Sequence, residues 1–294
     1  MITPTATISP PRRQTKLLSM KTLVFKPVVK IARDILPLRV FNAIYDFTFP
    51  IYKFLVRLAY FIRALATGRF LNREDFALVK RVYSVMPYSL VGYGGLEITD
   101  WAARAMIAKE VEGDYAELGV ARGGCAALLA MQIARLEAKN RKLWLFDSYE
   151  GLPEPGEKDF VSGPNGATGN HIRPLPKGSC RGALEEVQWL LFDKFGLNCE
   201  KIEFVKGWFE NTVPFKAPSI EKLALLRLDG DWYDSTRICL MHLYDKVSVG
   251  GIVIIDDYDS CAGSKLAVDE YLSKHQILVN LESDGRGGRW FQKP

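Results

Sequence analysis

Four aspartates follow two apolar runs in the C-terminal half of the 294-residue chain. The run LALLRL ends at Asp229, with Asp231 two positions later, and the run IVII ends at Asp256, which Asp257 follows. If both runs are strands of a parallel sheet, their carboxyl ends face one crevice and the four side chains converge there. Carboxylates held close together raise one another's pKa and repel, and a divalent cation removes that cost. All-oxygen ligation favours Mg²⁺, Ca²⁺ or Mn²⁺, whereas the alternative is that some of the aspartates cap the helices that follow.

A second group of residues indicates a nucleoside-containing ligand. Glu117 and Gly119 follow a short apolar run, and Gly123 and Gly124 open a segment rich in Ala and Leu. Glycines at such a turn let a ligand approach the backbone, and a helix N-terminus offers free N–H groups. Asp147 ends the next apolar run, LWLF, where an acid accepts hydrogen bonds from ribose hydroxyls. The turn lacks the G-x-G-x-x-G spacing of dinucleotide sites, although both adenosylmethionine and NAD carry a ribose. A ligand-free turn beside a solvated strand end is the structural alternative.

Other chemistries have little support in the sequence. The three histidines, His171, His242 and His275, are scattered and lack the spacing of metal ligands. The chain has no G-x-S-x-G nucleophile motif and no phosphate loop of the form G-x-x-x-x-G-K-[ST]. An odd number of cysteines without a C-x-x-C pair predicts neither a disulfide framework nor a zinc site and favours a reducing compartment. The cysteines are Cys125, Cys180, Cys199, Cys239 and Cys261.

A pattern of alternating strands and helices places these residues, and it starts near residue 100. Short apolar runs alternate with longer segments of helical periodicity, which predicts an α/β fold with a mostly parallel, doubly wound sheet. The last two runs, joined through Asp284 and Gly285, predict a C-terminal antiparallel pair. Residues 153–180 are rich in Pro and Gly, and loops of this length often act as lids or substrate walls. The predicted strands are residues 115–118, 143–146, 202–205, 223–228, 252–255, 277–281 and 289–292, and the predicted helices are residues 123–136, 183–195, 235–244 and 264–274.

The front of the chain differs from the rest in charge and composition. Residues 1–70 hold 12 Lys and Arg against two acids, whereas the remainder holds 27 bases and 32 acids. Residues 1–20 are predicted to be a disordered basic tail, residues 21–85 a helical extension that is both basic and apolar, and residues 86–294 the main folded domain. Such a front suggests an anionic partner, either a membrane surface or nucleic acid.

Within this extension, residues 51–66 (IYKFLVRLAYFIRALA) form the densest apolar stretch. Lys53, Arg57 and Arg63 interrupt it, which disfavours a membrane-spanning helix, and Pro50 is predicted to start the helix. One interpretation is an interfacial helix whose basic side chains reach the lipid headgroups. The other is a helix packed on the main domain or on a second subunit. No secretion signal is recognised.

Five segments, in this order, resemble motifs of the macrocin O-methyltransferase (TylF-like) family of class I S-adenosylmethionine-dependent methyltransferases. The resemblance covers roughly residues 86–291, and the pairing of LDGD with IIDDY is its most specific part. It implies a Rossmann-like methyltransferase fold and offers no counterpart for the first 70 or so residues. The segments are GDYAELGVARGG from Gly113, FDSYEGLPEP from Phe146, KGWFENTVP from Lys206, LRLDGDWYDST from Leu226 and IIDDY from Ile254.

The resemblance also implies roles for individual residues. Asp229, Asp256 and Asp257 fall on the Mg²⁺ ligands of the family, and Asp231 falls on its general base. With S-adenosylmethionine as the methyl donor and Mg²⁺ as the metal, the implied reaction is O-methylation of a sugar or of a glycosylated acceptor, including a lipid-linked one. The positions that fall on the adenosylmethionine site are Glu117, Gly119, Gly123, Asp147, Ser148, Gly207 and Trp208.

Two other functions compete with this prediction. An NAD-dependent sugar oxidoreductase or epimerase would use a similar sheet, but the spacing of the glycine turn and the four carboxylates disfavour it. A non-catalytic membrane-surface protein that retained the fold would not need both aspartate pairs intact. The expected partners are a sugar or glycan acceptor, an anionic membrane surface for residues 1–70 and a second copy of the chain, with no nucleic acid. The expected location is cytoplasmic, with peripheral association at the cytoplasmic membrane face.

Overall fold

The part of the chain that the computed structural model describes comprises residues 10, 38–136, 141–160 and 174–294. It divides into two compact units, one comprising Arg12–Pro87 and the other Met1–Pro11 together with Tyr88–Pro294. The predicted tail at residues 1–20 therefore lies almost wholly outside the described residues. The same holds for the centre of the predicted lid loop, residues 161–173.

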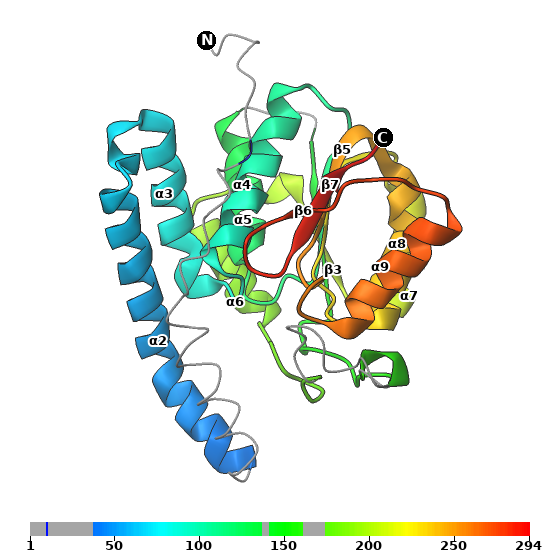
Figure 1. The fold of residues 1–294 in the computed structure, drawn as a ribbon, viewed down its shortest axis with the longest axis horizontal. Coiled ribbons are helices and arrows are strands. Elements are labelled where there is room, and N and C mark those ends of the chain that lie inside the picture. The colour runs from blue at the N-terminus through cyan, green and yellow to red at the C-terminus, as the bar shows by residue number, and fades with distance from the viewer. Residues whose placement is uncertain (1–9, 11–37, 137–140, 161–173) are drawn as a thin grey trace. The chain divides into compact units, whose positions relative to one another are not determined.

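The larger unit is built on one sheet (Figure 1) with the strand order β3-β2-β1-β4-β5-β7-β6. Strands β1 to β5 are parallel, and β7 runs antiparallel to both β5 and β6. The order reverses between β1 and β4, and ligands of doubly wound sheets bind outside the carboxyl ends of the strands at such a point. The predicted fold class, a mostly parallel sheet with a C-terminal antiparallel strand, is confirmed. The strands are β1 Asp114–Leu118, β2 Leu143–Asp147, β3 Ile202–Lys206, β4 Leu223–Leu228, β5 Val247–Ile255, β6 Glu282–Ser283 and β7 Arg289–Gln292.

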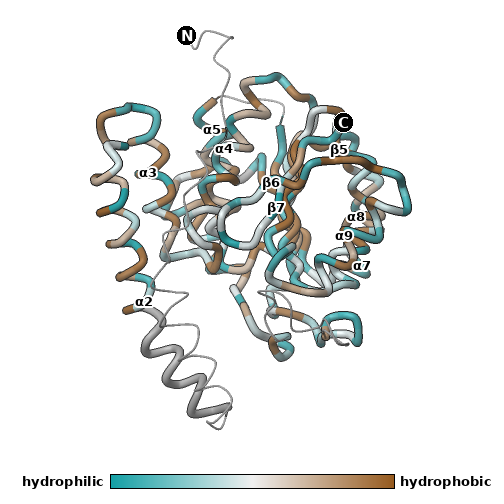
Figure 2. The backbone as a smooth tube through the Cα atoms, in the orientation of Figure 1, coloured by the Kyte–Doolittle hydropathy of each residue, from teal (hydrophilic) through white to brown (hydrophobic). Residues whose placement is uncertain are grey.

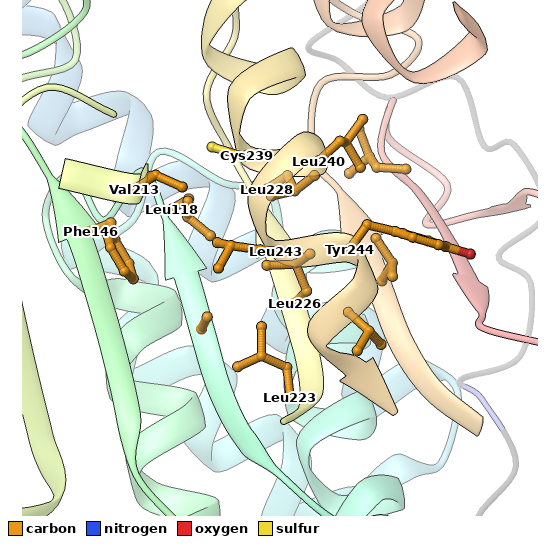
Figure 3. Packing of buried hydrophobic residues seen from close by; sticks show 14 of the residues in the cluster. Leu118, Phe146, Val213, Leu223, Leu226, Leu228, Cys239, Leu240, Leu243 and Tyr244 are labelled. Atoms are coloured by element: carbon orange, nitrogen blue, oxygen red, sulfur yellow. The ribbon is translucent and has the colours of Figure 1, made fainter. Parts of the chain in front are cut away.

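Helices cover both faces of this sheet, with α4, α5 and α6 on one side and α7, α8 and α9 on the other (Figure 1). Strands buried on both faces need nearly continuous apolar sequence, and the central strands β4 and β5 are accordingly mostly apolar (Figure 2). The large core cluster packs Phe146, Leu226 and Leu228 of the sheet together with Leu240 and Leu243 of α8 (Figure 3). The helices are α4 Tyr93–Ala108, α5 Gly124–Arg135, α6 Leu184–Gln188, α7 Phe209–Lys216, α8 Tyr233–Leu243 and α9 Ala262–Lys274.

Two of the predicted elements differ from the structure. The expected strand at residues 277–281 pairs with no neighbour: Ile277, Val279 and Leu281 pack against the core in alternation, and only Glu282–Ser283 joins the ladder with β7. The alternation of apolar residues in the sequence thus predicted which side chains pack on the core, but not that the backbone forms no strand pair. The expected helix at residues 183–195 is α6 followed by a wider π-helical turn, Trp189–Lys194.

The described part of the smaller unit contains two α-helices, α2 Leu38–Ala66 and α3 Arg73–Val85. The prediction that Pro50 starts the first helix was wrong, because α2 continues to Leu38, directly after another proline in the sequence. Asn72 caps α3: its side-chain oxygen accepts the backbone N–H groups of Glu74 and Asp75 at 2.8 and 3.1 Å. Among the described residues, none of the helices is both long enough and apolar enough to cross a membrane. Two 3-10 turns, η2 Arg69–Leu71 and η3 Met86–Tyr88, flank α3.

Candidate active site

Three of the predicted carboxylates meet at the carboxyl ends of β4 and β5. The parallel ladder continues past the strands, since the N–H of Asp229 donates to Leu118 O at 2.8 Å and that of Asp256 to Leu228 O at 2.9 Å. One oxygen from each of Asp229, Asp256 and Asp257 lies within 4.8 Å of the others. The structure therefore brings together, from two strands, the three residues predicted as metal ligands.

A buried arginine beneath this cluster was missed by the sequence analysis. Arg227 is fully buried in β4, and its Nη2 donates to Asp229 Oδ2 and to Asp256 Oδ1, both at 2.9 Å. The pairing of β1 with β4 sets Glu117 beside it, with Arg227 Nε 3.6 Å from Glu117 Oε1. One guanidinium thus faces three carboxylates. The available signal was a single charge within a strand of otherwise apolar residues.

A second arginine reaches the cluster from the turn between β6 and β7. Arg286 Nη1 lies 2.6 Å from Asp256 Oδ2. Its turn is held by Asp284, whose Oδ1 accepts the backbone N–H groups of Arg286, Gly287 and Gly288 at 2.7 to 3.0 Å. Because both oxygens of Asp256 accept guanidinium N–H groups, this carboxylate is the most firmly held of the three.

The cluster has the composition of a cation site. Asp257 Oδ2 is buried and, within the described part of the chain, has no hydrogen-bond partner. Burial, together with the neighbouring carboxylates, raises the pKa of Asp257 to about 8 and the pKa of Asp229 well above its usual value. The positive charges of Arg227 and Arg286 do not balance the negative charges of the neighbouring carboxylates. In addition, burying a carboxylate oxygen without a hydrogen-bond partner costs free energy. The donors present are all carboxylates, so the residues fit Mg²⁺, Ca²⁺ or Mn²⁺.

Asp231 adjoins this cluster in a strained backbone conformation. Its φ is 55°, in the left-handed region that Asp and Asn tolerate better than most residues. Asp231 offers one oxygen within 4.8 Å of ligand atoms of Asp257 and Cys261, and Cys261 Sγ lies 3.7 Å from Asp231 Oδ1. Burial and the charges of Asp229 and Asp256 raise the pKa of Asp231 to about 8. Such a pKa suits a group that must accept a proton near neutral pH.

The glycine turn lies directly against the carboxylate cluster. Gly119 has φ 95°, and a Cβ built on it would lie 1.8 Å from the carbonyl oxygen of Asp229, so no side chain fits there. Gly123, with φ 84°, stands at the N-terminus of α5 and provides no side-chain cap. Glu117 is buried, its pKa is raised to about 8 chiefly by burial, and its Oε2 has no hydrogen-bond partner among the described residues. The turn therefore sets backbone without side chains and an unpartnered carboxyl oxygen beside the carboxylate cluster, whereas the N–H groups of Gly119 and Gly123 donate to Phe146 O and Val120 O.

Asp147 holds the glycine turn in place, a role that sequence reasoning did not foresee. Its Oδ2 accepts the N–H groups of Val120 and Ala121 at 2.7 and 2.9 Å, and its Oδ1 accepts that of Tyr149 at 2.6 Å. Two carboxylate oxygens have about four acceptor positions, so a ribose hydroxyl can still be bound. The proposed ribose contact and the observed support of the turn are therefore compatible.

We expect Asp147→Ala to weaken adenosylmethionine binding about 5- to 150-fold, which corresponds to about 1–3 kcal/mol for hydrogen bonds to a charged group. The measurement is the dissociation constant by isothermal titration calorimetry. Asp114→Ala is the matched control: Asp114 accepts N–H groups from Lys142 and Trp144 at the opposite end of the sheet. An unchanged dissociation constant for Asp147→Ala would show that Asp147 serves the backbone alone.

The other predicted cofactor residues near Asp147 differ in the contacts that they make. Gly207 donates its N–H to Asp147 O at 2.9 Å, and Trp208, the next residue, is half-buried at the start of α7. The hydroxyl of Ser148 donates to Gly151 O and accepts the N–H of Glu150, so it stabilises its own turn. A polar hollow of about 510 Å³ opens beside these residues. Its lining includes Tyr149, Glu150, Arg181 and Lys206.

The described ends of the predicted lid loop are attached to the segment that carries Asp231. Trp232 Nε1 donates to Pro153 O at 3.2 Å, and the N–H of Tyr233 donates to Asp159 Oδ1 at 2.7 Å. Leu152 donates its N–H to Ser179 O at 2.8 Å, which joins the two ends of the loop. The lid itself stays a prediction, because its centre lies outside the described residues.

Comparison with known proteins identifies the family. Residues 72–293 match the family model described as Macrocin-O-methyltransferase (TylF). The chain belongs to this family. It is therefore an S-adenosylmethionine-dependent O-methyltransferase, as the sequence motifs predicted, and the alternative of an NAD-dependent oxidoreductase is set aside.

Individual relatives agree with this assignment. The chain is 36% identical over 222 residues to demethyldecarbamoylnovobiocin O-methyltransferase of Streptomyces niveus, covering 75% of this chain and 81% of the relative. It is 33% identical to 8-demethyl-8-(2,3-dimethoxy-alpha-L-rhamnosyl)-tetracenomycin-C 4'-O-methyltransferase of Streptomyces olivaceus, covering 74% and 80%. The solved structure of the O-methyltransferase NovP is similar with a TM-score of 0.61 and 37% identity, covering 70% of this chain and 82% of that one.

Proposed function

We propose that this enzyme transfers a methyl group from S-adenosylmethionine to a hydroxyl of a sugar or of a glycosylated acceptor, and that the reaction depends on Mg²⁺. The carboxylate cluster carries this proposal: Asp229, Asp256 and Asp257 converge, and one buried oxygen of Asp257 has no partner among the described residues. The tetracenomycin-C relative is named for a rhamnosyl compound, which supports a sugar-bearing acceptor.

The arrangement assigns a task to each group of residues. Methyl transfer forms a bond between the acceptor oxygen and the methyl carbon and breaks the bond from that carbon to the sulfonium, so alignment of donor and acceptor dominates catalysis. Asp229 and Asp257 would hold Mg²⁺ together with Asp256, which Arg227 and Arg286 keep in place. Bound Mg²⁺ supplies a lower pKa for the acceptor hydroxyl. Asp231 would receive the proton of that hydroxyl.

The donor side of the site would be formed by the glycine turn and its neighbours. Glu117, Gly119 and Gly123 would face adenosylmethionine, with Asp147 on the ribose and Trp208 near the adenine. A positively charged sulfonium becomes a neutral thioether in the reaction, so exclusion of water would favour it. Residues 153–180 would serve as the lid.

Binding of Mg²⁺ should release protons and strengthen as the pH rises. The pKa of Asp257 is raised to about 8, so this carboxyl is mostly protonated at neutral pH and must ionise to bind a cation. Below that pKa the affinity should fall by about tenfold per pH unit for each proton released. Calorimetric titration of Mg²⁺ in two buffers of different ionisation enthalpy counts the protons. A binding constant that does not change between pH 6 and pH 9 would contradict this assignment.

The acceptor class can be tested with labelled adenosylmethionine. The purified full-length chain is incubated with Mg²⁺ and with four acceptor pools: soluble glycosides, nucleotide-linked sugars, lipid-linked sugars and non-glycosylated phenols. We expect label in a glycosylated product, as an acid-stable methyl ether. Label only in non-glycosylated phenols would contradict a sugar acceptor, and adenosylmethionine binding without product in any pool would favour a non-catalytic chain.

The proposed setting is the cytoplasmic face of a membrane, with the enzyme as a homo-oligomer. An odd number of cysteines without a C-x-x-C pair is the basis for expecting a reducing compartment. Light scattering of the purified chain tests the oligomeric state. A lipid-linked sugar is the acceptor that this setting would favour.

A further inference from the structure

We propose that the outer face of α2 is a docking surface for an anionic lipid bilayer. The outer face comprises the large apolar side chains of residues 51–66 that are exposed. They are 42 to 61% exposed, a large fraction for residues that normally build a core. The members of the outer face are Ile51, Phe54, Leu55, Leu58, Phe61, Ile62 and Leu65.

The spacing of these residues makes one continuous stripe along the helix. At 3.6 residues per turn they fall within an arc of about 120°. Ala59 and Ala66, which are also exposed, widen this arc without adding a charge. Every exposed residue between residues 51 and 66 is therefore apolar.

The opposite side of α2 is used within the smaller unit. Tyr60 and Ala64 are buried there, and the guanidinium of Arg57 lies 4.2 Å from the ring centroid of Tyr83 on α3. Lys53, Arg57 and Arg63 are all half-buried. A helix of a globular protein normally turns its apolar stripe inward and its charges outward. Within the described residues of the smaller unit the stripe stays exposed, which makes it a candidate surface for a partner with an apolar interior.

The net charge of this part of the chain indicates which partner this is. Between residues 51 and 73 the chain carries five bases and no acid: Lys53, Arg57, Arg63, Arg69 and Arg73. Two copies of α2 packed face to face would bring these bases together without any acid from the same segment to pair with them. An anionic bilayer offers hydrocarbon to the outer face and a negatively charged headgroup layer to this basic segment. The aliphatic stem of Arg63, which is half-buried near the edge of the stripe, can extend to the interface.

Docking of this kind would bring the enzyme to lipid-linked glycosides as its class of acceptor. That part of the inference rests on the proposed function, whereas the lipid contact itself does not. A chain that bound vesicles without methylating a sugar would retain the docking surface and lose the proposed function. A chain that methylated soluble sugars without binding vesicles would do the reverse.

The test uses the full-length chain and two kinds of vesicle, phosphatidylcholine alone and phosphatidylcholine mixed with phosphatidylglycerol. We expect co-sedimentation with the mixed vesicles at low salt and weaker binding at high salt, because the electrostatic part is screened. The variant F54S/I62S/L65S removes three side chains of the outer face that lie in solvent. It should partition to the mixed vesicles at least about tenfold more weakly.

A matched variant controls for the loss of exposed apolar area as such. F215S/V249S/L278S removes three side chains of the larger unit that are 78 to 92% exposed. It should bind vesicles as the unchanged chain does, and both variants should keep their affinity for adenosylmethionine. Two outcomes would overturn the proposal: an unchanged chain that stays in the supernatant with mixed vesicles at low salt, or equal binding to vesicles of phosphatidylcholine alone. A third is a dimer that F54S/I62S/L65S dissociates without any vesicle binding, which would make the outer face a contact between copies.

Discussion

Removal of divalent cations should reduce methyl transfer by about a thousandfold or more, and Mg²⁺ should restore it. The reason is the cluster of Asp229, Asp256 and Asp257, where burial and like charges raise the pKa of the carboxyl groups and leave one oxygen of Asp257 without a partner. A Lewis acid that activates the acceptor hydroxyl contributes several kcal/mol. The measurement is the initial rate with labelled adenosylmethionine after treatment with EDTA and then with added Mg²⁺, Mn²⁺ or Ca²⁺.

A substitution separates the cation from other effects of the chelator. Asp257→Asn should weaken Mg²⁺ binding in calorimetry and lower the rate, while adenosylmethionine binding changes little. Asp193→Asn, at an exposed position of the π-helical turn, should alter neither quantity. Full activity in excess EDTA, or the same Mg²⁺ affinity in Asp257→Asn as in the unchanged chain, would rule out the metal role.

Substitution of Asp231 by Asn should slow methyl transfer by about a hundredfold or more, the usual loss when a general base is removed. Asn is the suitable replacement, because residue 231 has φ 55° and Asn tolerates the left-handed region as Asp does. Binding of Mg²⁺ and of adenosylmethionine should be nearly unchanged, because the Asp231 carboxylate is expected to accept the proton of the acceptor hydroxyl and to bind neither ligand. The effect is measured as the single-turnover rate of methyl transfer at a saturating concentration of the sugar acceptor.

The pH profile distinguishes a base from a residue that only shapes the site. In the unchanged chain the rate should rise with pH as Asp231 loses its proton, because its pKa is raised above the usual range for Asp. At a Mg²⁺ concentration that saturates the site at every pH, Asp231→Asn should remove this rise as well as lower the rate. Asp234→Asn is the control, since that side chain is 79% exposed at the start of α8. Normal turnover by Asp231→Asn would assign proton removal to another group.

The sequence alone determined the fold class and the position of the carboxylate cluster. Apolar runs separated by helical segments specify a parallel sheet, and the carboxyl ends of its strands meet at one edge. It follows from the sequence that Asp229, Asp256 and Asp257 come together, because Asp229 and Asp256 each directly follow a strand and Asp257 is the next residue after Asp256. The glycine turn was found in the same way, since Gly119 and Gly123 lie between a strand and a helix.

Only the tertiary structure decided which groups surround these residues. The register of β1 against β4 sets Glu117 beside Arg227, and these residues are 110 positions apart in the sequence, so no local pattern reports the pairing. The approach of Arg286 to Asp256 depends likewise on a turn that folds back from β7. For α2, the sequence showed a dense apolar stretch interrupted by three bases but not which side of the helix would be buried. The order of residues along a helix shows which side chains share a side, but packing decides which side is buried. In α2 the side with Tyr60 and Ala64 is buried, and the outer face is therefore exposed.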